Sequence, residues 1–232
     1  MKSFPVLFID DFFPDVEYVL NIAKNTEYEV KRSSATGVTS SLGLEKLDLG
    51  LHNYITEKVI SIFWPPNDYI ANCNLTIDFH KIDSFKSTNQ TFNKGAIHCD
   101  NVFGADLTVI IYLSDHKETN VGTSFYERKQ DVFLQGHTYV EDFQNALQAY
   151  NQDKEITEER EIIFNKYFDN FKETAKIQNK QNRAVIFPSN LWHGVTSFTE
   201  ETRYVARLIL FPSNVQCKYN NNYSINPLDR IN

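Results

Sequence analysis

The chain of 232 residues is poor in cysteine and in basic charge. Its three cysteines, Cys73, Cys99 and Cys217, are too few and too widely separated for a disulfide framework or a paired-cysteine zinc site, which predicts free thiols in a reducing compartment. The formal net charge is -7. Binding to a nucleic-acid backbone depends on clustered Lys and Arg, so this charge balance gives no support for a nucleic-acid partner.

Long apolar runs are absent as well. No uninterrupted stretch of about 18 apolar residues occurs, so the sequence predicts no membrane-spanning helix and no membrane partner. The apolar segment 4–9 is short and is followed at once by Asp10 and Asp11, unlike a secretory signal peptide. We therefore expect a cytoplasmic protein.

Hydrophobic residues, in contrast, make up 41% of the chain, and aromatic residues make up 14%, with 18 Phe and 12 Tyr. The hydrophobic content is enough for a sizeable core, and the many Phe and Tyr side chains favour β-sheet. The length fits one large β-rich unit, so residues 1–232 are expected to form a single domain.

Residues 1–66 are predicted to form a helical support beside the core. Residues 4–9 have the composition of a strand, and residues 16–25 follow a proline and an aspartate that favour a helix start. Residues 31–44 are rich in Ser, Thr and Gly and are predicted to be a loop. Helical spacing of apolar residues returns in 45–63 and ends at a Trp-Pro-Pro sequence.

The predicted core comprises residues 74–136 and 183–213. Residues 74–82 alternate between apolar and polar, as in a half-buried strand, and residues 108–113 (TVIIYL) are continuously apolar, as in a strand buried on both faces. The tail, residues 220–232, is polar and is predicted to be irregular. This order of elements predicts a mainly β fold with flanking helices, either a β-sandwich or a jelly roll.

Residues 138–180 interrupt the β pattern. They are highly charged, and their Phe, Leu, Tyr and Ile residues recur at helical spacing, which predicts one or two amphipathic helices inserted between strands. Such an insertion could form a lid over a binding site or a surface between two copies of the chain. The oligomeric state does not follow from the sequence.

The clearest chemical motif is His98-Cys99-Asp100. Residues two apart on a strand point to the same face, so His98 and Asp100 would present an imidazole nitrogen and a carboxylate oxygen side by side, with Cys99 turned away. His193, in the sequence NLWHGV, is the best candidate for a third ligand. Two histidines and one carboxylate, with positions left open for other ligands, are typical of non-haem Fe(II) oxygenases.

An arginine ten residues after His193 strengthens this interpretation. Arg203 could hold the far carboxylate of a dicarboxylate co-substrate, because guanidinium pairs with carboxylate through two hydrogen bonds. Arg207 would face the same way on a regular strand and is the rival for this role, or else a structural partner of an acidic residue. The remaining histidines (His52, His80, His116 and His137) are expected to be structural.

Two segments resemble the prolyl-4-hydroxylase-like branch of the 2-oxoglutarate and Fe(II)-dependent dioxygenases. They are HCDNVFGADLTVIIYLSD, which begins at His98, and HGVTSFTEETRYVARLIL, which begins at His193. The resemblance covers about 75–126 and 183–211. It implies a cupin-like double-stranded β-helix that uses Fe(II), 2-oxoglutarate and O2.

The same resemblance implies roles for single residues. His98, Asp100 and His193 would be the catalytic metal ligands, Arg203 would anchor the distal carboxylate of 2-oxoglutarate, and Tyr112 would donate its hydroxyl to that carboxylate. Asn101, next to the aspartate ligand, would lie near the metal or contact the substrate. Many relatives carry a serine two residues after the arginine, where this chain has Val205, so Tyr112 or Tyr126 is the candidate to supply the missing hydroxyl.

The predicted function is hydroxylation of a C–H bond in a peptidyl residue, an amino acid or a small metabolite, with release of succinate and CO2. Two alternatives remain open from the sequence. One is a jelly-roll binding module that holds a metal without turnover, and the other is a cupin-like enzyme that uses another divalent metal.

Overall fold

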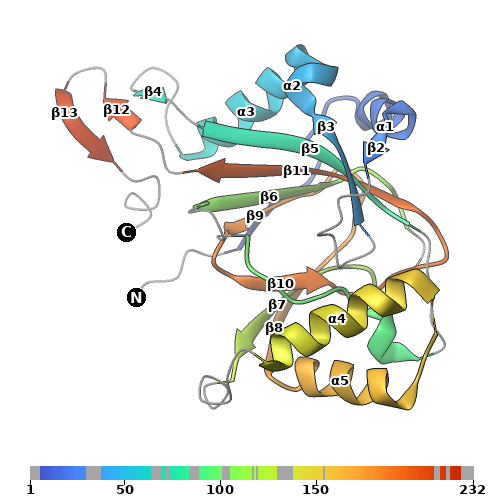
Figure 1. The fold of residues 1–232 in the computed structure, drawn as a ribbon. Coiled ribbons are helices and arrows are strands. Elements are labelled where there is room, and N and C mark those ends of the chain that lie inside the picture. The colour runs from blue at the N-terminus through green and yellow to red at the C-terminus, as the bar shows by residue number, and fades with distance from the viewer. Residues whose placement is uncertain are drawn as a thin grey trace.

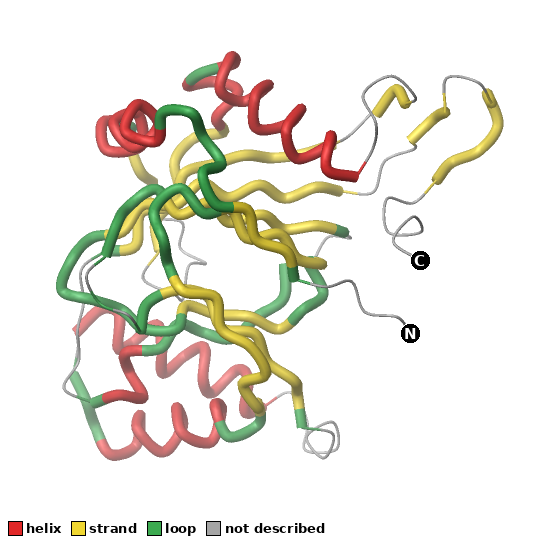
Figure 2. The backbone as a smooth tube through the Cα atoms, turned by 180° about the vertical axis from the view of Figure 1, so that it is seen from behind, coloured by secondary structure: helices red, strands yellow, loops and turns green. Residues whose placement is uncertain are grey.

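The structure is a computed structural model, and it describes residues 6–29, 38–63, 69–71, 74–83, 89–100, 105–116, 118, 120–129, 138–153, 155–211, 215–217 and 220–225. Within these parts of the chain, two antiparallel sheets face each other, and helices cover the outer side of each (Figure 1). The view from behind shows the same order of layers, with the two groups of helices at opposite ends (Figure 2).

The larger sheet has seven strands in the order β1-β9-β6-β11-β5-β3-β2. Their bounds are β1 Leu7–Ile9, β2 Tyr28–Glu29, β3 Val38–Gly43, β5 Asn74–Ile82, β6 Leu107–Tyr112, β9 Ala184–Pro188 and β11 Arg203–Phe211. The two central strands β6 and β11 are antiparallel neighbours, with Tyr112 opposite Val205 and Ile110 opposite Arg207. Strands adjacent in the sheet are therefore far apart in the chain, as in a jelly roll.

The smaller facing sheet has the order β10-β7-β8, with β7 Gly122–Arg128, β8 Phe171–Gln178 and β10 Trp192–Val195. A third sheet joins β4 Tyr69–Ala71, β12 Val215–Cys217 and β13 Asn220–Ile225. The two main sheets are held together by apolar side chains from their inner faces. These are Tyr112, Phe125, Val185, Phe187 and Val205.

Three helices cover the outer face of the larger sheet: α1 Val16–Asn25, α2 Leu44–Leu47 and α3 Leu49–Phe63. Helix α1 begins where predicted because the Asp15 side chain accepts a hydrogen bond from the backbone N–H of Tyr18. Its apolar stripe, Val19, Leu20 and Ala23, is buried in the main core together with the outward-facing strand residues Ile77 and Leu208.

The predicted insertion contains two helices, α4 Thr138–Asp153 and α5 Glu158–Phe168, and a short 3-10 helix, η1 Gln90–Asn93, packs against them. Helix α5 begins at Thr157, which caps it, and carries acidic residues in its first turn. The helices and η1 enclose a second core that is mostly aromatic: Phe92, Phe143, Tyr150, Phe164, Tyr167 and Phe171. This core lies on the outer side of the smaller sheet (Figure 1).

Three segments differ from the sequence prediction. Within the predicted loop 31–44, residues 38–43 form β3, because β5 supplies hydrogen-bond partners that a Ser- and Thr-rich sequence can use (residues 31–37 lie outside the described residues). Within the predicted helices 138–180, residues 171–178 form β8, an edge strand whose side chains are mostly exposed and include Lys172, Glu173 and Lys176. In the predicted irregular tail, residues 220–225 pair with β12.

None of the helices in the described parts of the chain is long and apolar enough to cross a membrane. The division into support, core and insertion (1–66, 74–136 with 183–213, and 138–180) stays a prediction.

Candidate metal centre

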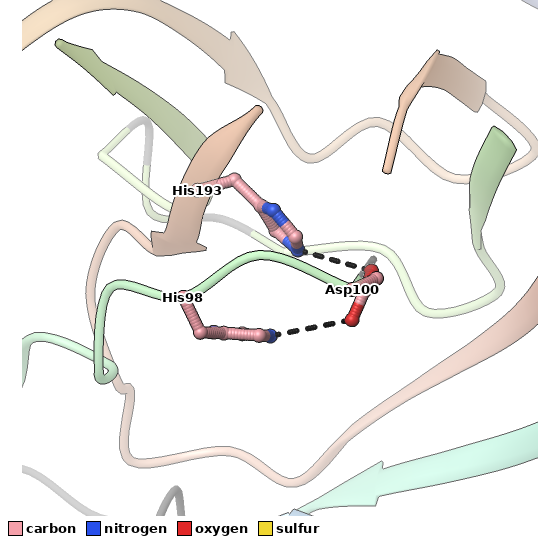
Figure 3. Close-up of side chains that lie close together, drawn as sticks. All are labelled: His98, Asp100 and His193. Atoms are coloured by element: carbon pink, nitrogen blue, oxygen red, sulfur yellow. Dashed lines mark ion pairs between the residues drawn. The ribbon is translucent and has the colours of Figure 1, made fainter. Parts of the chain in front are cut away.

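His98, Asp100 and His193 meet at one point, although His193 lies far from the other two in the chain (Figure 3). One ligand atom from each residue can be chosen so that all three lie within 4.8 Å of one another. Nε2 of His98 lies 3.7 Å from one carboxylate oxygen of Asp100, and Nε2 of His193 lies 3.4 Å from the other. The structure thus brings together the three ligands that the sequence predicts.

The backbones of the two histidines are joined directly. His98 and His193 form an isolated antiparallel bridge, in which the N–H of His98 donates to the carbonyl of His193 at 2.8 Å and the N–H of His193 donates back at 2.9 Å. The segment before His98 and the strand β10 therefore act as one unit that carries both imidazoles.

Two glycines allow this close approach. A Cβ atom on Gly194 would lie 3.0 Å from the carbonyl oxygen of Ala96, and a Cβ atom on Gly95 would lie 2.8 Å from the Cβ of Val195. A side chain at either position would push the two segments apart, so glycine is required here by space rather than by an unusual backbone angle.

Each imidazole is oriented by a backbone carbonyl. Nδ1 of His98 lies 3.0 Å from the carbonyl oxygen of Ala96, and Nδ1 of His193 lies 3.0 Å from that of Leu191. A carbonyl can only accept, so Nδ1 carries the proton in both rings and the Nε2 lone pairs point to the shared position. This tautomer is the one that a metal at Nε2 needs.

Asp100 is also held in place. Its second carboxylate oxygen accepts a hydrogen bond from Thr108 at 3.0 Å, and the Thr108 hydroxyl is bonded to Ser189 at 2.8 Å. Burial alone would raise the pKa of Asp100, but the proximity of His193, His98 and Arg207 holds this pKa below its usual range. The carboxyl group is therefore ionised and available to a cation.

The His98 imidazole is neutral at physiological pH. The protein atoms around the ring, followed by the proximity of His193, lower the pKa of His98, although 47% of its side chain stays exposed to solvent. One ionised carboxylate and a neutral imidazole from His98 give a centre that attracts a divalent cation without first losing a proton at this histidine.

Arg203 lies at the start of β11 and is 2% exposed. One of its terminal nitrogens donates to the carbonyl of Ser197 at 3.0 Å, but its Nε atom is buried without a hydrogen-bond partner. Burial lowers the pKa of Arg203 to about 10, which still leaves the group charged at pH 7. Among the described residues no carboxylate forms an ion pair with this cation.

Tyr112 lies on β6 and faces the space between the sheets. Its hydroxyl is 2.7 Å from the hydroxyl of Thr123 on β7. Burial raises the pKa of Tyr112 to about 12, while the charge of Arg203 opposes this rise. Tyr112 therefore keeps its proton, and it lies within the electrostatic reach of Arg203.

Arg207 has different surroundings from Arg203. Its Nε and one terminal nitrogen donate to the two carboxylate oxygens of Asp78 at 3.2 and 3.1 Å, and His80 lies 3.2 Å from the same carboxylate. The structure thus places Arg207 in the second of the roles that the sequence left open, as partner of an acidic residue.

One further predicted position, Asn101, lies outside the described residues. Tyr126 is half-buried in the aromatic core on the outer side of the smaller sheet, where it packs against Phe171. Sequence analysis missed three hydroxyl side chains whose partners come close only in the folded chain: Thr108, Ser189 and Thr123. A signal was available for Thr108, because strand alternation from Tyr112 places it on the inner face of the sheet.

Solved structures of low sequence identity share this fold. The α-ketoglutarate-dependent epimerase SnoN from nogalamycin biosynthesis aligns with a TM-score of 0.53 at 11% identity, over 90% of this chain and 78% of SnoN. A 2OG-Fe(II) oxygenase family protein from Burkholderia pseudomallei aligns with a TM-score of 0.52 at 8% identity, over 92% and 88% of the two chains. HygX from Streptomyces hygroscopicus, solved with nickel and 2-oxoglutarate, aligns with a TM-score of 0.51 at 11% identity, over 90% and 83%.

These likenesses establish the fold as the jelly roll of the 2-oxoglutarate and Fe(II)-dependent oxygenases, as the sequence resemblance implies. Residues 1–197 match a family that is described only as a family of unknown function, DUF6445, and the chain belongs to that family. No curated protein sequence matches this chain.

Proposed function

We propose that this protein is a non-haem Fe(II) and 2-oxoglutarate-dependent dioxygenase that hydroxylates a C–H bond and releases succinate and CO2. The observation that carries the proposal is the combination of a three-ligand site with a buried arginine whose Nε has no hydrogen-bond partner and on which the carboxylate of Glu118 acts only at long range. A metal-binding module needs the first of these features but not the second.

The ligand set fits Fe(II). Two imidazoles and one carboxylate leave part of the coordination sphere open for the co-substrate and O2, and bound iron would supply the oxygen-activating chemistry. The residues of this chain hold that site: Ala96 and Leu191 orient the rings through their carbonyls, and Thr108 fixes the carboxylate.

Arg203 supports a dicarboxylate co-substrate. A buried guanidinium without an anion is costly, and a carboxylate that accepts from its unpaired Nε would remove that cost. Tyr112 can donate a second hydrogen bond, because its hydroxyl remains protonated. We assign the distal carboxylate of 2-oxoglutarate to Arg203 and Tyr112, and not to Arg207, whose charge Asp78 already neutralises.

The positions of these residues along the strands agree with that assignment. Thr108, which holds Asp100, and Tyr112 lie on the same strand and both face inward, about 13 Å apart along β6. An extended dicarboxylate lying along the inner face, together with the length of the arginine side chain, can bridge the metal position and the Arg203 end of the sheet.

For the primary substrate we propose a chemical class and not a single compound. The resemblance to prolyl-4-hydroxylases favours a peptidyl residue, and an amino acid or another small metabolite would use the same chemistry. We expect the protein to act on a small-molecule or peptide substrate and not on nucleic acid.

The test is succinate formation from 2-oxoglutarate when anaerobic, Fe(II)-loaded protein is exposed to air without a primary substrate. We expect slow turnover in the wild type that is lost in His98→Ala and Arg203→Ala. His52→Ala is the matched control for His98→Ala, because His52 lies on α3, on the outer side of the larger sheet. Wild-type protein that binds metal but neither binds nor consumes 2-oxoglutarate would sink the oxygenase proposal in favour of a non-catalytic module or an enzyme of another metal.

A further inference from the structure

Tyr167 joins the inserted helices to the metal-binding segment. It lies at the end of α5, and its hydroxyl donates a buried hydrogen bond to the backbone carbonyl of Ile97, the residue before His98. Its ring is stacked on Phe143 of α4, with centroids 3.6 Å apart and planes at 5°. The donor is therefore fixed by packing against a second helix.

The peptide group that accepts this bond also belongs to the metal centre. Its carbonyl, from Ile97, accepts from Tyr167, and its N–H, from His98, donates to the carbonyl of His193 at 2.8 Å. The orientation of this peptide plane sets the direction of the His98 side chain. The peptide group between Ile97 and His98 is thus held on one side by Tyr167 of the insertion and on the other by the backbone of His193.

The second histidine has a parallel connection. Trp192, directly before His193, packs at the edge of the same aromatic core, with its ring 5.3 Å from that of Phe171. Both metal histidines are therefore preceded by a residue, Ile97 or Trp192, whose side chain packs in or against the aromatic core built by α4 and α5.

The chain before His98 is tied to α5 as well. Asn89 donates to the Glu161 side chain at 2.8 Å, Thr91 donates to the Asn165 side chain at 2.9 Å, and the Phe92 ring is stacked on Phe164 at 4.4 Å. These contacts connect η1 and the residue before it to α5 across more than one turn of helix.

We propose that the helical insertion is the structural support of the metal centre, and that Tyr167 is a positioning residue for His98. The inference rests on the proposed function only in placing a metal at His98, Asp100 and His193. A lid over the pocket would have to separate from the sheet, whereas α4 and α5 share a packed aromatic core and a buried hydrogen bond with the ligand segments.

The test compares Tyr167→Phe with Tyr28→Phe by calorimetric titration with Ni(II), used as a redox-stable probe. Tyr28 is a matched control, because its hydroxyl also donates to a backbone carbonyl, that of Ala23, but lies against the helices on the far side of the larger sheet. Each variant removes one oxygen and one hydrogen bond. We expect Tyr167→Phe to weaken Ni(II) binding roughly tenfold, as for other groups that orient a metal ligand, and Tyr28→Phe to leave it unchanged.

Equal Ni(II) affinities of Tyr167→Phe and wild type would overturn the inference. If Tyr167→Phe does not fold, hydrogen exchange in the wild type decides the matter. Because coupling is reciprocal, Ni(II) should then slow amide exchange in residues 158–168 of α5 and not in residues 16–25 of α1. Unchanged exchange in α5 on Ni(II) binding contradicts the proposal.

These measurements use neither 2-oxoglutarate nor O2. A protein that binds Ni(II) through a site supported by Tyr167 but forms no succinate would refute the proposed function and leave this inference standing. Wild-type protein that binds no Ni(II) would refute both.

Discussion

At the scale of single residues, two arginines on the same face of β11 illustrate how surroundings determine role. Arg207 shares a carboxylate with His80, whereas Arg203 is buried with an unpaired Nε. Strand alternation alone cannot separate the two, because residues four apart point the same way. The difference between the two arginines comes from Asp78, which pairs with Arg207. Asp78 lies 129 residues before Arg207 in the chain, so this ion pair could not be predicted from the sequence.

Thr108 offers a prediction at this scale. Thr108→Val keeps the shape of the side chain but leaves the Asp100 carboxylate without its hydroxyl donor, so metal affinity should fall roughly tenfold. Calorimetric titration with Ni(II) measures this change. Thr196→Val is the matched control, since Thr196 is likewise a buried threonine bonded to a serine, Ser124, but contacts no metal ligand. Equal weakening in both variants would show a general loss of stability instead.

The ion pair of Asp78 predicts a pH dependence of stability. Burial by itself would raise the pKa of Asp78, but the hydrogen bonds and charges of His80 and Arg207 hold it at about 2. A depressed pKa stabilises the fold above the pKa of the unfolded chain, near 4, and this contribution is lost as the pH falls towards 2.

Urea unfolding of wild type and Asp78→Asn measures this contribution. We expect Asp78→Asn to lower the free energy of unfolding by about 2 kcal/mol at pH 7, with the difference shrinking between pH 4 and pH 2. Asp83→Asn is the control, because Asp83 pairs with Lys81 at an exposed site and should cost less than about 1 kcal/mol. A difference between wild type and Asp78→Asn that persists at pH 2 would contradict the assignment.

At the scale of elements, the sequence predicted those strands and helices whose pattern reflects burial. Strand β6 is mainly apolar and buried on both faces, and α1 has both a cap and an apolar stripe. Strands β3 and β8 were missed because pairing with a neighbour, and not their own composition, makes them strands. The candidate ligand residues were predictable because they occur in short sequence motifs. The residues that hold them in place by hydrogen bonds, such as Thr108 and Tyr167, belong to other elements and have no such motif.

The pairing of the segment before His98 with β10 predicts a sensitive position. Gly194→Ala places a methyl group against the backbone of Ala96, so it should separate the two histidine-bearing segments and reduce both metal affinity and stability, the latter by about 1–3 kcal/mol. Gly50→Ala in α3 is the control: its new methyl group meets only the Asp48 side chain, and stability should change by no more than about 1 kcal/mol. Thermal unfolding and Ni(II) titration of both variants test this contrast.

At the scale of the whole molecule, the layers place the metal centre between two separate cores. The larger sheet and α1–α3 form one core, and α4 and α5 with the smaller sheet form the other. Asp100 is tied through Thr108 to the larger sheet, while both histidines are tied to the smaller sheet and the insertion. A bound ion would therefore connect the two halves.

The bridge between His98 and His193 has a thermodynamic consequence of its own. An ion held by both residues would act as a reversible cross-link between segments that are roughly 95 residues apart in the chain. Because the ion would bind the folded chain and not the unfolded one, it would stabilise the fold by about 2.7 kcal/mol at an ion concentration one hundred times its Kd. Removal of the ion by a chelator should thus lower the melting temperature and quicken global unfolding. Loss of the metal would weaken the whole protein and not the metal-binding segments alone.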